Sequence, residues 1–337
     1  LPVEKVKLNM LFAGGSFGRR ANPDSDYLVE AVHIARAKMG TPIKLVWSRE
    51  DDMHAGYFRP AYVHRVRGGL DDEGNIVGWE QHIVGQSILT GTPFGQGIKN
   101  GVDHSSVEGA STLPYAIPNV RVEVTSTEEK VPVLWWRSVG HTHTAYSTET
   151  FIDELAVTAG RDPLELRMKL LADHPRWQGV LKLAADKAGW GKGLPDGWGR
   201  GIAVHESFNS YVAQVAEVSV AEDGKFKVER VVCAVDCGVP INPDVIRAQM
   251  EGGIGFGLAP ALVSAVTFRD GKVVESNFHN YQVLRINQMP AVEVHIVPST
   301  EPPTGVGEPG VPPIAPAVAN ALAAATGKRY YTLPIKV

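Results

Sequence analysis

The residue best suited to chemistry lies near the C-terminus, where one glutamate stands among glycines and prolines in Gly305-Val306-Gly307-Glu308-Pro309-Gly310. Proline stiffens such a segment, and glycine lets other backbone approach closely. A carboxylate in a rigid, close-packed loop loses contact with water and can act as a general base. A purely structural interpretation is equally open, because Glu308 precedes a predicted helix whose N-terminal dipole favours an acidic residue.

A second segment, Trp135 to His143, combines aromatic, basic and flexible residues. Arg137 lies beside indoles and shortly before Gly140, an arrangement that can bind an oxyanion or a flat aromatic ring. His141 and His143 are two residues apart, so in a strand they would share one face, a spacing that some metal sites use. No third ligand is recognisable, and a hydrophobic strand with a surface arginine explains the same residues.

The third segment, Gly14 to Arg20, is rich in glycine and follows a predicted strand. Adjacent Gly14 and Gly15 let backbone N–H groups approach a ligand closely. The spacing matches neither the dinucleotide-binding pattern G-x-G-x-x-G nor a P-loop, which argues against a nucleotide-binding enzyme. A tight turn between a strand and a helix is the alternative that needs no ligand.

Composition limits the other classes of function. The chain has 337 residues and a net charge of −4, so it offers no electrostatic basis for binding nucleic acid. No apolar run approaches the ~20 residues that cross a bilayer, and no transmembrane segment is predicted. Cys233 and Cys237 lack a second Cys or His pair at ligand spacing, so we interpret them as buried thiols and assign no metal ligand.

Hydrophobic periodicity and turn residues predict a mixture of hairpins and packed helices, which indicates an α+β fold. Strands are predicted at 6–12, 43–47, 61–69, 76–88, 120–125, 201–205, 211–220, 225–235, 261–268, 272–275 and 292–297. Helices are predicted at about 26–39, 144–159, from 163, 180–188, 243–257 and 315–325. The glycine-rich stretch 192–200 predicts a linker between a first lobe, residues 1–191, and a second lobe, residues 192–337.

Eight segments together resemble the molybdenum-binding subunit of the xanthine dehydrogenase/aldehyde oxidase family, in particular its isoquinoline 1-oxidoreductase beta-subunit branch. Each segment is weak alone, but the ordered set covers almost the whole chain and is specific. The segments are GGSFGRR (14–20), KLVWSREDDM (44–53), WWRSVGHTH (135–143), FIDELA (151–156), VHESFNSYVAQVAEVSV (204–220), VDCGVPINPD (235–244), QMEGGIGFG (249–257) and GVGEPGVPPIAPAVANA (305–321).

The resemblance implies two lobes of a molybdopterin-binding domain and a role for each matching residue. Glu308 would be the catalytic base in the oxidation of an aldehyde or N-heteroaromatic carbon, with water as the source of oxygen. The substrate would meet Arg137, Trp136 and His141. The residues implied near the molybdopterin are Gly14, Gly15, Ser16, Phe17, Ser138, Val139, Gly140, Gln249, Gly252, Gly253 and Gly307.

The resemblance also implies partners. The branch carries a Gly-Gln-Gly segment upstream of GGSFG, whereas this chain has Gly95-Gln96-Gly97 downstream of it. We therefore expect an N-terminal half of the molybdenum subunit on another polypeptide, sharing a molybdopterin cytosine dinucleotide with molybdenum. A [2Fe-2S] subunit, with or without a cytochrome c subunit, would take the electrons. The complex would be periplasmic or lie on the periplasmic face of a membrane, with the cytoplasm as the alternative. The alternative is a non-catalytic assembly or scaffold domain without cofactor.

Overall fold

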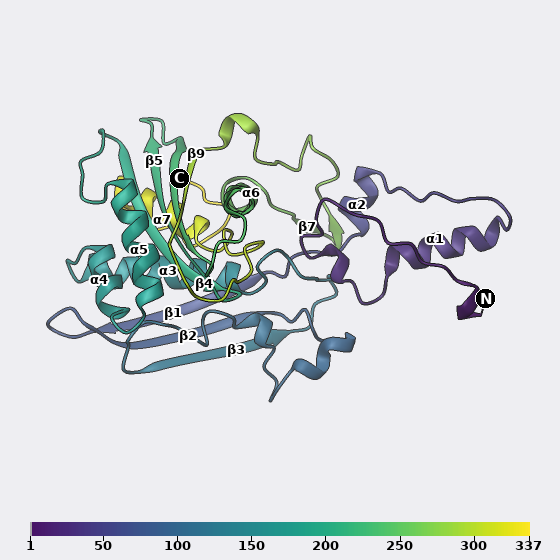
Figure 1. Ribbon diagram of the computed structural model, residues 1–337, viewed down its shortest axis with the longest axis horizontal. Coiled ribbons are helices and arrows are strands. Elements are labelled where there is room, and N and C mark those ends of the chain that lie inside the picture. Colours follow the sequence, from purple (N-terminus) through teal and green to yellow (C-terminus); the bar gives the residue numbers. More distant parts are fainter. Residues whose placement is uncertain (1) are drawn as a thin grey trace.

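The computed structural model describes residues 2–337 and shows two layered sheets with an extended N-terminal segment (Figure 1). The helices are α1 Asp26–Ala37, α2 Arg49–Ala55, α3 His141–Thr158, α4 Pro163–Leu170, α5 Pro175–Ala188, α6 Pro243–Leu262 and α7 Ile314–Thr326. The strands are β1 Tyr62–Leu70, β2 Ile76–Gln86, β3 Val120–Thr127, β4 Trp198–Ser207, β5 Ser210–Val220, β6 Phe226–Asp236, β7 Phe268–Arg269, β8 Lys272–Val273 and β9 Ala291–Ile296. The α+β prediction is confirmed.

A four-stranded sheet, in the order β4-β5-β6-β9, forms the centre of the molecule. Its first three strands are antiparallel, whereas β9 runs parallel to β6. One face, with Ile202 and Val204, packs in the same core as α5, while the other face meets α7. Helix α7 approaches so closely that a Cβ on Gly201 would lie 2.1 Å from the Ala321 nitrogen. Burial on both faces explains the nearly continuous apolar runs of β5 and β6.

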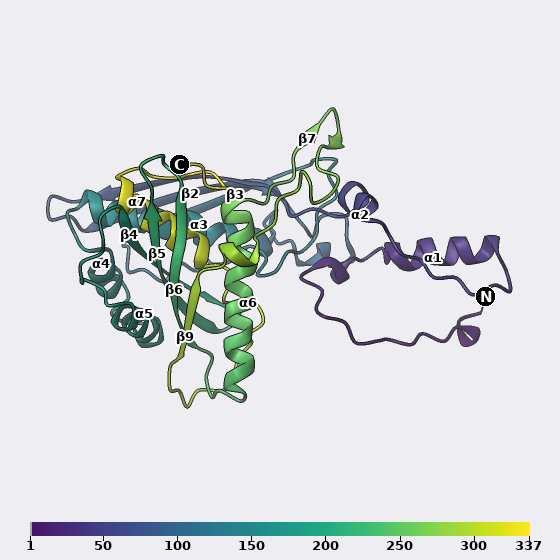
Figure 2. The ribbon, with the colours of Figure 1, turned by 90° about the horizontal axis from the view of Figure 1, so that it is seen from above.

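A smaller sheet, in the order β1-β2-β3, lies on the side of α3 that faces away from the central sheet (Figure 2). Its inward residue Trp79 shares a core with Leu155 of α3 and with Ile202 and Val215 of the central sheet. This core therefore joins residues from both sides of position 191. The division into lobes 1–191 and 192–337 stays a prediction.

A buried ion pair fixes α3 within this arrangement. The Glu149 carboxylate accepts hydrogen bonds from the Arg167 guanidinium at 2.9 Å, the Tyr115 hydroxyl at 2.5 Å and the Val204 amide at 2.9 Å. Both charged side chains are fully enclosed, with exposed fractions of 0% for Arg167 and 2% for Glu149. Because each buried charge has its partner, the pair can link α3, α4 and β4 without an unpaired charge.

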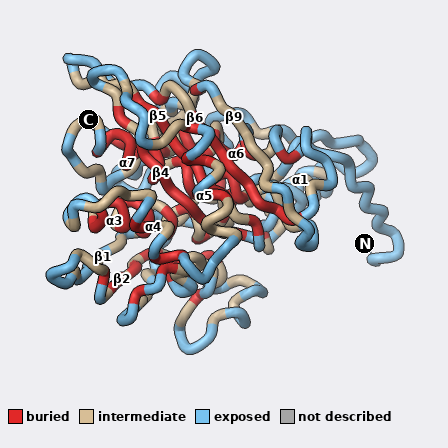
Figure 3. Tube along the Cα trace, turned by 60° about the vertical axis from the view of Figure 1, so that its left-hand side comes forward, coloured by how far each residue is buried: buried red, intermediate tan, exposed pale blue. Residues whose placement is uncertain are grey.

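The segment before β1 departs most from the sequence prediction (Figure 3). The predicted strands 6–12 and 43–47 do not form, because no neighbouring strand provides hydrogen bonds. The Phe12 side chain is fully exposed. Helix α1 forms as predicted, but none of its residues is buried. Among residues 2–337, no helix is both long and apolar enough to cross a membrane.

Two other predictions are wrong. His141 and His143 lie on helix α3 rather than on a strand, so their side chains do not share one face. The predicted strand 261–268 is largely absent, because Ala261 belongs to the last turn of α6. In the predicted hairpin 261–275, pairing is limited to the two-residue strands β7 and β8. The remaining predicted helices and strands form within a few residues of their predicted bounds.

Candidate functional site

Glu308 lies in the turn before α7 and faces the segment before α3. The amide of Ser138 donates to Glu308 Oε1 at 2.9 Å, and the Ser138 hydroxyl donates to the Glu308 carbonyl at 2.8 Å. The side chain and the backbone of Glu308 are thus both bound by one residue. This double contact fixes the direction of the carboxylate, which a general base requires.

Arg137 fastens the same loop to α6. Its Nε donates to the Gly307 carbonyl at 2.7 Å, Nη2 donates to the same carbonyl, and Nη2 also reaches Gln249 Oε1 at 3.1 Å. Burial lowers the pKa of Arg137, whereas the nearby charge of Glu308 acts in the opposite direction. The predicted cofactor residues Gln249 and Gly307 are therefore brought together by Arg137. Its contact with substrate stays a prediction.

The backbone between Arg137 and α3 is strained. Ser138 and Val139 have φ values of 74° and 48°, a region that non-glycine and especially β-branched residues rarely adopt. The Val139 carbonyl is held by the Thr142 hydroxyl at 2.9 Å. Gly140 must be glycine because a Cβ would lie 1.9 Å from the Ser105 carbonyl oxygen. This strained segment carries the Ser138 amide that binds Glu308.

Three aromatic side chains, Phe17, Trp136 and Phe256, pack together beside Arg137. The Phe256 ring packs against Trp136 at 4.6 Å and stacks on Phe17 at 5.3 Å between ring centres. The Phe17 carbonyl accepts the Arg137 amide at 3.1 Å. Gly18 permits this approach, since a Cβ there would lie 1.9 Å from the Trp135 carbonyl oxygen. The GGSFG and WWRSVG segments therefore meet, as the shared role predicted for them requires.

The predicted cofactor glycines differ in their surroundings. Gly14 and Gly15 are exposed, and no hydrogen bond within residues 2–337 links them to the other site residues. Gly253 is buried against Gly310. Around Gly252 and Gly307, by contrast, an added Cβ would meet nothing within 4 Å. This open space beside the Gln249 side chain lets a flat ligand such as a pterin approach the backbone closely.

The protein side chains do not form a metal site of their own. Within residues 2–337, no three His, Cys, Asp or Glu side chains are grouped to hold a metal ion. Cys233 is buried and unbridged in β6, and burial raises its pKa to about 12. We assign no residue of this chain as a metal ligand.

Two residues near the site are not among the predicted site residues: His205 lies in the resembling stretch 204–220, and Glu108 lies in none of the eight resembling stretches. Glu108 accepts the Gly140 amide at 3.1 Å, and His205 of β4 pairs through Nε2 with His141 Nδ1 at 2.8 Å. Burial lowers the pKa of His141 to about 4, so this imidazole is neutral at neutral pH. Glu108 and His205 meet this segment only through folding, because long stretches of chain separate them from it.

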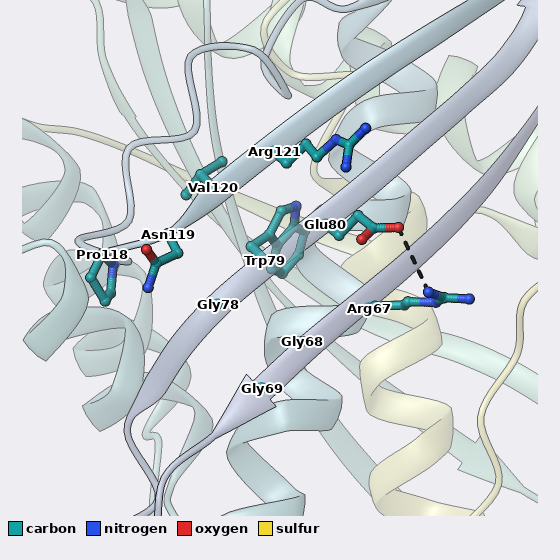
Figure 4. A pocket seen from close by; sticks show the side chains of 10 residues that line it. All are labelled: Arg67, Gly68, Gly69, Gly78, Trp79, Glu80, Pro118, Asn119, Val120 and Arg121. Carbon is teal, nitrogen blue, oxygen red and sulfur yellow. Dashed lines mark ion pairs between the residues drawn. The ribbon is translucent and has the colours of Figure 1, made fainter.

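A shallow hollow of about 620 Å³ lies elsewhere, on the small sheet β1-β2-β3 (Figure 4). It is lined by Arg67, Gly68, Gly69, Gly78, Trp79, Glu80, Pro118, Asn119, Val120 and Arg121. An exposed pair, Arg67 and Glu80 at 3.9 Å, stands over it. None of these residues belongs to the site around Glu308, so size alone does not identify the functional site.

Known proteins resemble the chain along its whole length. It is 33% identical to isoquinoline 1-oxidoreductase subunit beta of Brevundimonas diminuta, over 99% of this chain and 43% of that protein. It is 31% identical to a membrane-bound aldehyde dehydrogenase [pyrroloquinoline-quinone] of Gluconacetobacter polyoxogenes, over 100% of this chain and 47% of that protein. The chain thus spans less than half the length of these relatives.

Solved structures share the fold of this chain. Quinoline 2-oxidoreductase from Pseudomonas putida 86 superposes with a TM-score of 0.81 at 15% identity, covering 95% of this chain and 66% of that one. Two family profiles, both described as molybdopterin cofactor-binding domain, match residues 1–171 and 88–290. The chain therefore belongs to the molybdopterin cofactor-binding domain family, as its resemblance to molybdenum-binding subunits of the xanthine dehydrogenase type predicted.

Proposed function

We propose that this chain is part of the catalytic subunit of a molybdenum hydroxylase that oxidises an aldehyde or an N-heteroaromatic carbon with oxygen from water. The observation that carries the proposal is the bond from the Ser138 amide to Glu308 Oε1, in a loop that Arg137 fastens to α6. When bound, a molybdopterin with molybdenum supplies the two-electron redox chemistry, and the protein supplies orientation and proton transfer.

Glu308 serves as the base in this proposal. Its Oε1 is occupied by Ser138, whereas no donor within residues 2–337 binds Oε2, which is left to accept a proton. The rings of Trp136 and Phe256 pack against each other and give this side of the site an apolar, aromatic lining. Gln249 would hold the pterin through its side-chain amide, and Gly252 and Gly307 would let it approach the backbone closely.

The partners are proposals of the same kind. We propose that an N-terminal half of the molybdenum subunit completes the cofactor site and that the pterin is the cytosine dinucleotide form. A [2Fe-2S] subunit, with or without a cytochrome c subunit, takes the electrons, and the complex is periplasmic. The similarity to a subunit of isoquinoline 1-oxidoreductase supports a multi-subunit complex. Co-purification and cell fractionation test the partners and the compartment.

The deciding experiment is analysis of the purified complex for molybdenum and for released pterin. Stoichiometric molybdenum with a cytosine-containing pterin is expected. A complex that contains neither would favour the scaffold alternative. A complex that contains pyrroloquinoline quinone, the cofactor printed in the name of one relative, would overturn the proposal in favour of quinone chemistry.

A further inference from the structure

A second carboxylate, Glu108, binds the same short segment as Glu308. Glu308 Oε1 accepts the amide of Ser138 at 2.9 Å, and Glu108 Oε2 accepts the amide of Gly140 at 3.1 Å. The Glu108 backbone carbonyl is held in turn by the Thr144 hydroxyl of α3 at 2.5 Å. Two acids from distant parts of the chain thus flank one strained turn, and both are fixed by its backbone.

The charges around Glu108 are one-sided. The titratable groups around it are Asp103 from the preceding turn, Tyr62 of β1, Glu308 from the loop before α7, and His141 of α3, whose Nε2 lies 3.9 Å from Glu108 Oε2. His141 is neutral near pH 7 because burial lowers its pKa to about 4. No Lys or Arg within residues 2–337 forms an ion pair with Glu108. Among residues 2–337, the Gly140 amide is therefore the group that stabilises a negative charge at this position, and no cation pairs with it.

These surroundings favour the protonated form of Glu108 while the carboxylate of Glu308 keeps its backbone donor. Burial first, and then the charges of Asp103 and Glu308, raise the pKa of Glu108 to about 7, against the opposite effect of the Gly140 amide. The side chain still has an exposed fraction of 32%, so it can reach a bound molecule. A carboxyl group that its surroundings keep protonated can donate a hydrogen bond near neutral pH.

We propose that Glu108 is a substrate-recognising residue of this site, donating a hydrogen bond to an acceptor atom of the substrate while Glu308 acts as the base. The proposal rests on the proposed function and extends it. It selects substrates with a lone pair beside the carbon to be oxidised, such as a ring nitrogen or an aldehyde oxygen. A hydrogen bond at that atom withdraws electron density from the neighbouring carbon and makes it easier to attack by a nucleophile.

The test uses the assembled, molybdenum-containing complex and measures kcat/KM for isoquinoline and for benzaldehyde between pH 5.5 and 9, per bound molybdenum. In the wild-type protein, kcat/KM should fall above about pH 7, where Glu108 loses its proton and can no longer donate. Glu108→Gln keeps a neutral donor that does not titrate. It should retain about wild-type kcat/KM at pH 6 and lose the alkaline decline.

Two further variants keep the inference falsifiable. Glu108→Ala removes the donor and should lower kcat/KM about ten- to hundredfold at pH 6, the effect of one hydrogen bond. Glu206→Gln is the matched control, since burial also raises the pKa of Glu206, but its carboxylate accepts the Asn209 amide and contacts no residue of the 137–140 segment. The control should keep the wild-type pH profile.

The outcomes separate the two proposals. An alkaline decline that persists in Glu108→Gln, or wild-type activity per molybdenum in Glu108→Ala, would overturn the role of Glu108 while leaving the hydroxylase intact. A complex that holds molybdenum but oxidises neither isoquinoline nor benzaldehyde would overturn the substrate class on which that role depends. A complex without molybdenum would overturn the proposed function itself.

Discussion

Ser138 binds Glu308 twice, through its amide to Oε1 at 2.9 Å and through its hydroxyl to the backbone carbonyl at 2.8 Å. The two residues are 170 positions apart. Ser138 makes both bonds with a φ of 74°, and Gly140 two residues later allows the chain to enter α3 beside Ser105. The cost of this strained backbone, about 1–3 kcal/mol for a residue of this kind, is offset by the contacts that hold the segment.

Replacing Glu308 by glutamine tests the base. Glutamine keeps an oxygen that can accept the Ser138 amide, so the loop should stay in place, but it cannot take up a proton. Turnover should fall about 10²–10⁴-fold with normal molybdenum content. The control is Glu301→Gln, an exposed glutamate of the same segment, which should keep wild-type turnover. Near wild-type turnover of fully loaded Glu308→Gln would make Glu308 a structural residue.

Replacing Arg137 by lysine tests whether its hydrogen bonds connect the Glu308 loop to α6. A single ammonium group cannot reproduce the planar guanidinium that serves both the Gly307 carbonyl and Gln249 Oε1. The loss of a charge-assisted hydrogen bond should destabilise the folded state by about 1–3 kcal/mol, and cofactor retention should fall with it. Thermal unfolding and molybdenum analysis measure the two effects. Arg121→Lys, in an exposed pair with Glu123, should leave both unchanged.

Adding a methyl group at Gly307 or Gly252 tests the place of the cofactor. A Cβ there meets nothing within 4 Å, so Gly307→Ala should unfold at about the wild-type temperature, and Gly252→Ala, inside helix α6, at that temperature or above. If the pterin lies against this backbone, both variants should nevertheless contain less pterin than the wild-type complex. Gly193→Ala, equally unobstructed but remote in the linker before β4, is the control. Full pterin content in both variants would place the cofactor elsewhere.

Removing Arg167 tests the buried ion pair between Arg167 and Glu149. Arg167→Met would leave the Glu149 carboxylate enclosed without its cation, which typically costs about 3–5 kcal/mol. Chemical denaturation should show that loss. Arg121→Met breaks an exposed pair with Glu123 and should cost less than about 1 kcal/mol. Equal effects of the two variants would show that the Arg167 pair contributes no more than a surface pair.

The sequence by itself determined most local structure and the membership of the family. Asp162 and Pro163 predicted the start of α4, and the Asp162 side chain indeed accepts the Leu164 and Glu165 amides. The apolar runs of β5 and β6 predicted strands because both of their faces are buried. Capping and hydrophobic burial act within a few residues or on whole strands, and both can be seen in sequence order.

Only the tertiary structure decided which separated segments meet. The sequence could not show that Arg137 binds the loop of Glu308 rather than facing solvent. Nor could it show that Glu108 binds the amide of Gly140 in the turn that follows Arg137. The strand predicted at 6–12 failed for the same reason, since a strand depends on a partner that local sequence does not specify. Hydrogen bonds between distant segments form only when the packed sheets and helices have brought their donors and acceptors within reach.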